Sequence, residues 1–163
     1  MTRQSERGLT LIEVATVCAI LAIFVGVAFP MFNNTIAQHR LAGATQRVAN
    51  DLRYARSTAV TQGAIQRLHS GDDGGVQPGQ YRLETPNGLG WTGLTPWYSL
   101  ATDYQGAAMA SIKDGTSATI YVVSFDAQGA PNAALNYPLN ITVTTPVGTR
   151  SIKVMRTGNI VVP

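Results

Sequence analysis

The chain has 163 residues, a formal net charge of +3 and only 13% charged residues. This length allows one domain and an appendage, which argues against a second full domain. The small positive charge is compatible with nucleic acid or anionic lipid as a partner but does not argue for either. The single cysteine, Cys18, excludes an intramolecular disulfide and a cysteine-based metal cluster.

The first thirty residues carry the strongest signal in the sequence. Residues 1–8 are polar and include Arg3 and Arg7, whereas residues 9–29 read LTLIEVATVCAILAIFVGVAF, with Glu13 as their one charged residue. As a helix this run would span about 30 Å, the thickness of the hydrocarbon core of a bilayer. The arginines before the run predict an N-terminus in the cytoplasm and the rest of the chain outside it.

Glu13 does not suit a simple membrane anchor. A carboxylate in an apolar helix costs several kcal/mol unless it is paired, protonated or close to the interface. Cleavage after Gly8 would create an α-amino group on Leu9, one helical turn from Glu13. In a staggered bundle of such helices, the amine of a neighbouring chain could neutralise the acid. The spacing therefore predicts that the helix assembles with other subunits.

The motif RGLTLIEV, which begins at Arg7, resembles the prepilin class III signal. In that signal a membrane peptidase cuts after the glycine and methylates the new N-terminus. The resemblance implies that residues 1–8 form a leader cut after Gly8, that Leu9 becomes the N-methylated first residue, and that Glu13 is the acid of the mature helix. Leu9 departs from the family pattern, in which phenylalanine is usual.

Two other interpretations of the N-terminal segment stay open. A secretory signal peptide would end near residues 27–29, but its apolar region would be unusually long and would contain an acid. An uncleaved anchor for an enzyme would leave Glu13 without a role. Both interpretations fit the sequence less well than the prepilin signal.

The helix is predicted to continue to residue 62, with residues 9–30 as its transmembrane half. Pro30 lies where pilins often carry a proline that loosens or kinks the helix. Beyond it, one apolar stripe recurs at spacings of mostly three or four: Ile36, Leu41, Ala44, Val48, Leu52, Ala55 and Ala59. Gly63 is the predicted helix stop.

Residues 63–163 read as strands and turns, which predicts a β-rich head. The segments 64–69, 80–84 and 97–100 are short candidate strands, and 118–125 (ATIYVVSF) is predicted as a central strand because both of its faces are apolar. Residues 140–145 and 150–156 are predicted to form a hairpin, followed by a last strand at 160–162. The predicted fold class is α+β, with a long helix packed on an antiparallel sheet.

The head carries a second resemblance, through DLRYARSTAVTQG, SFDAQGAPN and RSIKVMRTGNIVV. These segments are similar to the GspH/FimT-type pseudopilins and minor pilins. The resemblance implies a low-abundance structural subunit of a type IV pilus or, alternatively, of a type II secretion pseudopilus. Its implied partners are other pilin or pseudopilin subunits, the prepilin peptidase and the inner membrane. The subunit would cross that membrane once, with its head in the periplasm, before it enters the pilus or pseudopilus.

DNA binding is a further alternative. Some members of that family bind DNA through a Gly-Arg-x-Arg arrangement near the C-terminus, and the corresponding turn here, residues 157–160, contains no arginine. Arg150, Lys153 and Arg156 could still offer a basic edge to phosphates. A solvated strand edge is the favoured interpretation of these three residues.

No motif predicts an enzyme, a metal site or a cofactor. His39 and His69 are far apart and lack ligand spacing. Asp72 and Asp73 lie in a glycine-rich turn but lack the full spacing of a calcium loop. The sequence therefore predicts a structural subunit without catalysis and without a cofactor.

Overall fold

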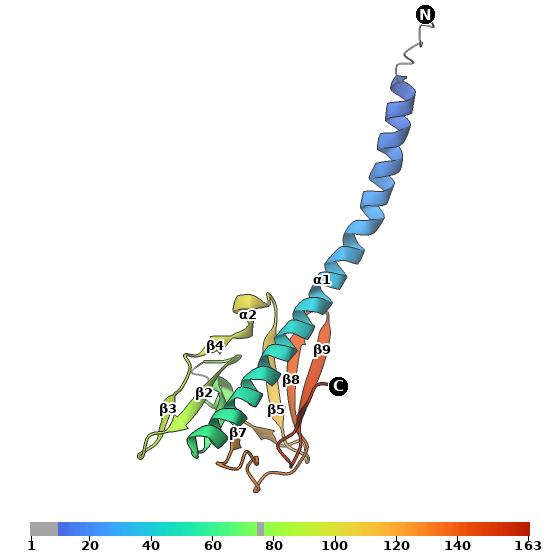
Figure 1. Ribbon diagram of the computed structural model, residues 1–163. Coiled ribbons are helices and arrows are strands. Elements are labelled where there is room, and N and C mark those ends of the chain that lie inside the picture. Colours follow the sequence, from blue (N-terminus) through green and yellow to red (C-terminus); the bar gives the residue numbers. More distant parts are fainter. Residues whose placement is uncertain (1–9, 75–76) are drawn as a thin grey trace, which may run out of the picture. The chain divides into compact units, whose positions relative to one another are not determined.

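The computed structural model describes residues 10–74 and 77–163, and for residues 27–31 it describes the backbone alone. Two compact units divide the chain, Met1–Ile36 and Ala37–Pro163. The elements in chain order (Figure 1) are α1 (Leu11–Gln62), β1 (Gln66–Ser70), the 3-10 turn η1 (Gly71–Asp73), β2 (Gln80–Pro86), β3 (Trp91–Gly93), β4 (Tyr98–Ser99), α2 (Leu100–Asp103), β5 (Ala108–Lys113), β6 (Thr119–Ile120), β7 (Val122–Phe125), β8 (Leu139–Thr145), β9 (Gly148–Val154) and β10 (Ile160–Val161).

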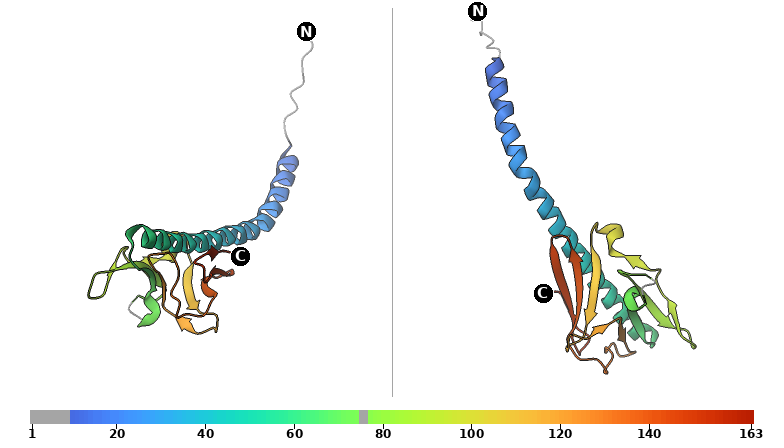
Figure 2. Two further views of the ribbon diagram at one scale, coloured as in Figure 1. Left: turned by 60° about the horizontal axis from the view of Figure 1, so that its bottom comes forward. Right: turned by 180° about the vertical axis from the view of Figure 1, so that it is seen from behind.

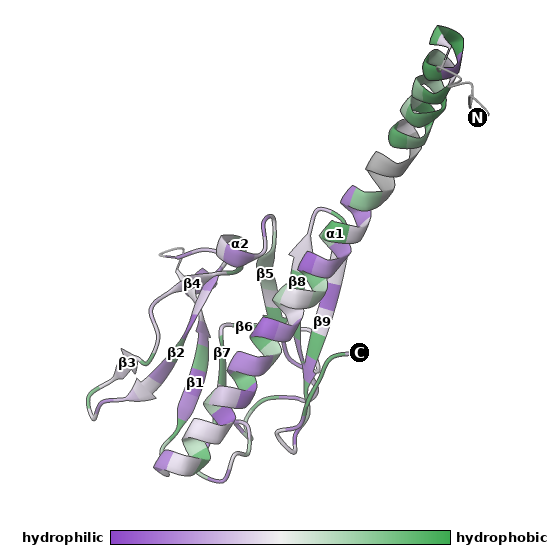
Figure 3. Ribbon diagram, turned by 45° about the horizontal axis from the view of Figure 1, so that its top comes forward, coloured by the Kyte–Doolittle hydropathy of each residue, from purple (hydrophilic) through white to green (hydrophobic). Residues whose placement is uncertain are grey.

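The first unit is the N-terminal part of α1. Its side chains are exposed from Leu11 to Gly26. The large apolar residues there face outward, and the first turns of α1 are coloured as hydrophobic in Figure 3: Leu11, Ile12, Val14, Val17, Ile20, Leu21, Ile23, Phe24 and Val25. None of the helices within the described ranges combines the length and the apolar character that a membrane crossing needs.

The second unit, which we call the head, begins with the C-terminal part of α1. Six of the seven residues predicted for the apolar stripe are buried: Leu41, Ala44, Val48, Leu52, Ala55 and Ala59. The prediction is wrong for Ile36, which belongs to the first unit and is 46% exposed. Three of the six buried residues are alanines, and such small side chains let the helix backbone approach the sheets closely.

The helix ends where the sequence predicts. Gly63 adopts a positive φ of 62°, which glycine tolerates without strain. The N–H of Ala64 donates a hydrogen bond of 3.2 Å to the carbonyl of Ala59, the long bond of a Schellman motif. This motif turns the chain directly into β1.

The head contains two antiparallel sheets of five strands, where the sequence predicts one sheet. The order of the first is β3-β2-β1-β7, with β4 also paired to β2, and the order of the second is β10-β9-β8-β5-β6. Strands β8 and β9 pair from Leu139–Val154 to Thr145–Gly148, and β10 places Ile160 opposite Val154. The predicted terminal hairpin and last strand are therefore confirmed. Strands β3 and β5 are not predicted from the sequence.

One core joins α1 and both sheets. Figure 2 shows the head part of α1 lying across the two sheets, and the core residues come from all three elements. The contributors from the sheets include Leu68, Leu83, Val123 and Phe125 in the first sheet, and Ile141, Val143, Ile152 and Val154 in the second. Every buried hydrophobic residue of the described chain lies between Leu41 and Ile160, within the head.

The segment 118–125 is not a central strand, which corrects the prediction. It divides at Tyr121 into β6, at the edge of the second sheet, and β7, at the edge of the first. Tyr121 is 40% exposed at this junction, and its carbonyl accepts a hydrogen bond of 2.8 Å from the N–H of Ser70. Apolar residues occur on both faces because the two halves serve two different sheets.

Candidate assembly site

Thr10 and Glu13 form a reciprocal cap at the start of α1. Glu13 Oε2 accepts hydrogen bonds from the N–H of Thr10 at 2.8 Å and from its hydroxyl at 2.9 Å. The N–H of Glu13 donates in turn to Thr10 Oγ1 at 3.3 Å. This arrangement is a capping box, in which a threonine and a glutamate three residues later satisfy free backbone donors of the first turn. The Thr-x-x-Glu spacing is a signature of such a cap, and the sequence analysis missed it.

The cap leaves part of the Glu13 carboxylate available. Both of the hydrogen bonds that it accepts end on Oε2, and Oε1 has no partner among residues 10–74 and 77–163. Nor does any cation of the described ranges lie within ion-pair distance of Glu13. The acid is therefore oriented at the helix N-terminus and exposed among apolar side chains, without a positive partner of its own unit.

The structure does not test the roles predicted for the other processing and assembly residues. Gly8 and Leu9 lie outside the described residues, so cleavage and methylation there stay predictions. Helix α1 continues through Pro30. Whether this proline loosens the assembled helix stays a prediction as well.

The three basic residues near the C-terminus do not form one cluster. In the ladder of β8 and β9, Arg150 lies opposite Val143 and Lys153 opposite Asn140. Residues three apart on a strand point to opposite faces, so these two side chains diverge. Arg156 lies in the turn after β9 and lines a separate cavity beside Tyr137. A DNA contact at these positions stays a prediction.

A second set of charged residues, which the sequence analysis did not bring together, lies on the first sheet around Glu84. The Glu84 side chain is 1% exposed. Its carboxylate lies 2.5 Å from Arg67 Nε, 2.7 Å from Arg82 Nε and 3.1 Å from His69 Nδ1. Two indole rings stack on the arginines. The ring centroid of Trp91 lies 3.9 Å from Arg67 Cζ, and that of Trp97 lies 4.5 Å from Arg82 Cζ. The pairing of β1 with β2 sets this cluster, because Arg67 lies directly opposite Glu84.

The cluster keeps Glu84 ionised in spite of its burial. Burial alone acts to raise the pKa of Glu84, because it disfavours the charged form. The hydrogen bonds from His69, Arg67 and Arg82 outweigh that effect and hold the pKa of Glu84 below its ordinary value of 4.5. Glu84 and its three donors therefore form a buried ion cluster that is part of the structure of the head.

The two acids of the glycine-rich turn, Asp72 and Asp73, form hydrogen bonds with neighbouring residues of the head. Asp72 Oδ1 accepts the N–H of Gly79 at 2.8 Å, and Asp73 Oδ2 lies 2.6 Å from His69 Nε2. His39 is exposed on α1 and takes no part in the hydrogen bonds around Glu84. In the part of the chain that the structure describes, no group of three or more histidine, cysteine or acidic residues is placed to hold a metal ion.

A long helix with exposed apolar first turns, an acid capped at its N-terminus and an antiparallel head define the class of pilin-like subunits. Solved structures of this class share the fold. The type IV minor pilin FimU of Pseudomonas aeruginosa is 16% identical, with a TM-score of 0.55 over 77% of this chain and 90% of that chain. The minor pseudopilin EpsH of the Vibrio cholerae type 2 secretion system is 11% identical, with a TM-score of 0.57 over 76% of this chain and 96% of that chain.

The chain belongs to the GspH family, because the family model described as type II transport protein GspH matches residues 44–158. The prokaryotic N-terminal methylation motif matches residues 3–29 and covers the predicted signal. No curated protein matches the chain with significant similarity. The protein is a structural subunit of the minor pilin and pseudopilin class, which assembles with other pilin-type subunits, and the predicted family is confirmed.

Proposed function

We propose that the chain is a minor subunit of a type IV pilus, cut after Gly8 by a prepilin peptidase, methylated at Leu9 and assembled through its N-terminal helix. A pseudopilin of a type II secretion system is the alternative, and it rests on the same physical chemistry. The genes that surround the coding sequence would separate the two, because they would encode either pilus biogenesis or a secretion channel.

The observation that carries this proposal is the exposed apolar surface of the first unit. Nine large apolar residues between Leu11 and Val25 are each at least 49% exposed. Apolar surface of this extent marks a region that is buried against a partner, since burial stabilises by about 25 cal/mol per Å². A bundle of like helices offers that burial, and so does a bilayer before assembly.

Glu13 gives the bundle its register in this proposal. The free oxygen Oε1 would accept the methylated amine of Leu9 from a neighbouring subunit, while Oε2 keeps the cap with Thr10. An ion pair in apolar surroundings is strongly favoured over either charge alone. Subunits in the wrong register would leave both charges unpaired.

Before assembly, we place residues 9–30 in the inner membrane, with the N-terminus in the cytoplasm and the head in the periplasm. The length of the apolar run and the arginines before it support this localisation. The peptidase and the membrane are therefore partners of the N-terminal segment. We assign no catalytic activity and no cofactor to the chain.

Two substitutions at Glu13 test the proposal and separate charge from capping. Glu13→Ala removes both, whereas Glu13→Gln keeps an acceptor for Thr10 and loses only the charge. Both variants should be cut after Gly8, and both should be nearly absent from sheared filaments when these are compared with membranes by immunoblot. Filaments that contain Glu13→Gln at the wild-type level would overturn the role of the charge.

A further inference from the structure

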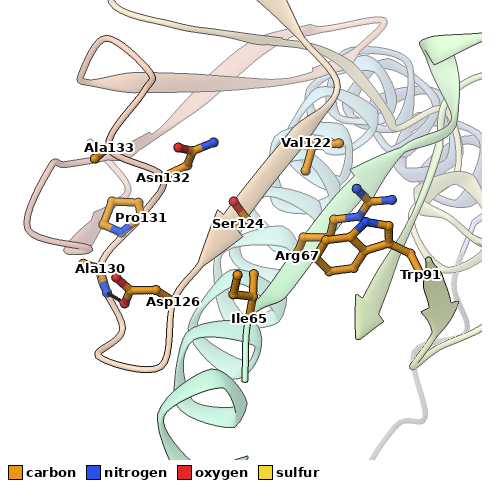
Figure 4. A pocket seen from close by; sticks show the side chains of 10 residues that line it. All are labelled: Ile65, Arg67, Trp91, Val122, Ser124, Asp126, Ala130, Pro131, Asn132 and Ala133. Carbon is orange, nitrogen blue, oxygen red and sulfur yellow. Dashed lines mark hydrogen bonds between the residues drawn. The ribbon is translucent and has the colours of Figure 1, made fainter. Parts of the chain in front are cut away.

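A groove of about 530 Å³ lies on the first sheet, on the part of it formed by β1 and β7 (Figure 4). Ile65 and Ser124 contribute to its floor, Trp91 and Arg67 form one side, and the loop of residues 130–133 forms the other. We call it the Arg67 groove. It belongs entirely to the head and is remote in sequence from the processing and assembly residues of the N-terminus.

Arg67 is fixed in this groove but uses few of its donors. Its Nε is bound to Glu84 at 2.5 Å, and the Trp91 ring lies 3.9 Å from Cζ. Within residues 10–74 and 77–163, no hydrogen bond is made by its two terminal nitrogens. A guanidinium held by stacking and by one ion pair loses little conformational entropy when its free edge binds a planar anion.

The groove suits a carboxylate next to an apolar side chain. The free edge of Arg67 matches the bidentate geometry of a carboxylate. Ile65, which is 47% exposed, and the ring of Trp91 offer apolar contact area on the same surface. Asp126, at the far side of the groove, is oriented by its own turn, because its Oδ1 accepts the N–H groups of Gln128 and Ala130 at 3.0 and 2.8 Å. Among the described residues the ion pair of Arg67 is with Glu84 and not with Asp126.

A second copy of this chain is poorly equipped to supply that carboxylate. Of its nine acidic residues, all except Glu6 lie in the described ranges. Glu13 is reserved for the amine of Leu9 in the proposed function, and the other seven are already hydrogen-bonded within their own chain: Asp51, Asp72, Asp73, Glu84, Asp103, Asp114 and Asp126. An acid from a different protein is therefore the better complement.

We propose that the Arg67 groove binds an acidic peptide segment of another protein, with a carboxylate on the free edge of Arg67 and a neighbouring apolar side chain between Ile65 and Trp91. This interaction does not depend on cleavage after Gly8 or on Glu13. Its failure would therefore leave the proposed assembly function untouched, and the reverse also holds.

The test is a titration of the full-length protein in detergent micelles with two blocked tripeptides, N-acetyl-Leu-Glu-Leu-amide and N-acetyl-Leu-Gln-Leu-amide. The readout is the indole N–H resonance of Trp91, assigned with the Trp97→Phe variant. The acidic peptide should shift this resonance in a saturable way and bind about tenfold more tightly than its amide analogue. Equal affinity for the two peptides, or no shift with either, would overturn the proposal.

Three variants make the test specific. Arg67→Lys keeps a cation beside Glu84 but loses the planar edge, so it should lower the affinity for the acidic peptide about tenfold. Ser124→Trp fills the floor of the groove without altering the pair of Arg67 and Glu84, and it should abolish the shift. Arg150→Gln removes an exposed cation on the second sheet and should change nothing. Wild-type affinity in Ser124→Trp, with the fold intact by circular dichroism, would place the peptide elsewhere.

Discussion

Arg67 Nε and Glu84 Oε2 lie 2.5 Å apart across the paired strands β1 and β2, in a site where Glu84 is 1% exposed. The head thus provides its most buried acid with cations from its own sequence. Glu13 is the opposite case, since its neighbours within the described ranges are a hydroxyl, backbone amides and apolar side chains. An acid that the fold leaves without a cation is the natural place to bring in the amine of another subunit.

The stability of the head should depend on pH through Glu84. Its folded pKa is depressed below 4.5, so its contribution is present above about pH 4.5 and is lost as the pH falls through the folded pKa. Denaturant unfolding of fragment 37–163, which contains every buried hydrophobic residue of the described chain, should give a lower free energy of unfolding at about pH 3 than at about pH 6.

The Glu84→Gln variant is the control for that pH dependence. It should lose about 3 kcal/mol at neutral pH, because Arg67 and Arg82 are left without their anion. Its unfolding free energy should also fall less steeply between the two pH values. A slope equal to that of the wild type would show that other carboxylates cause the effect.

Gly158 should tolerate no side chain. Its φ is 78°, and a Cβ at this position would lie 2.5 Å from the carbonyl oxygen of Gly129. Arg56 on α1 binds the loops that contain Gly129 and Gly158. Its Nε donates to the carbonyl of Gly129 at 3.0 Å, and its Nη2 donates to the carbonyl of Thr157 at 3.4 Å. Gly158→Ala should therefore destabilise the head by about 2 kcal/mol in denaturant unfolding.

Gly90→Ala is the matched control, since its φ lies outside the left-handed region and its Cβ would meet only Asn87 at 3.9 Å. It should change the unfolding free energy by less than about 0.5 kcal/mol. Equal losses in the two variants would contradict the close approach of the two loops.

The Thr10 cap should be separable from processing. Thr10→Ala removes the hydroxyl that bonds Glu13, so the amide of Glu13 should exchange faster with deuterium in micelles, while cleavage after Gly8 continues. Thr10→Ser keeps a hydroxyl and should retain the wild-type exchange rate. Unchanged exchange in Thr10→Ala would mean that the capping box does not hold the first turn.

Local patterns in the sequence predict the parts of the fold that depend on local physics. The stop at Gly63, the buried stripe from Leu41 to Ala59 and the hairpin of β8 and β9 follow from a positive φ, a helical period and strand alternation. The division at Tyr121 does not follow, because a continuous apolar run has the same pattern whether it serves one sheet or two.

The cluster around Glu84 could not be predicted for a related reason. Arg67 lies seventeen residues before Glu84, and only the register between β1 and β2 brings them together. Glu84 therefore reads as an isolated acid in the sequence. The capping box is different, because Thr10 and Glu13 are three residues apart and their spacing is itself the signal.

Mass spectrometry of the N-terminus of the protein purified from its native membranes tests the central claim most directly. The account predicts a chain that begins at N-methyl-Leu9, with the amine that Glu13 of a neighbouring subunit needs. A chain that retains residues 1–8 in cells with a working prepilin peptidase would contradict it, because the proposed partner of Glu13 would then never form.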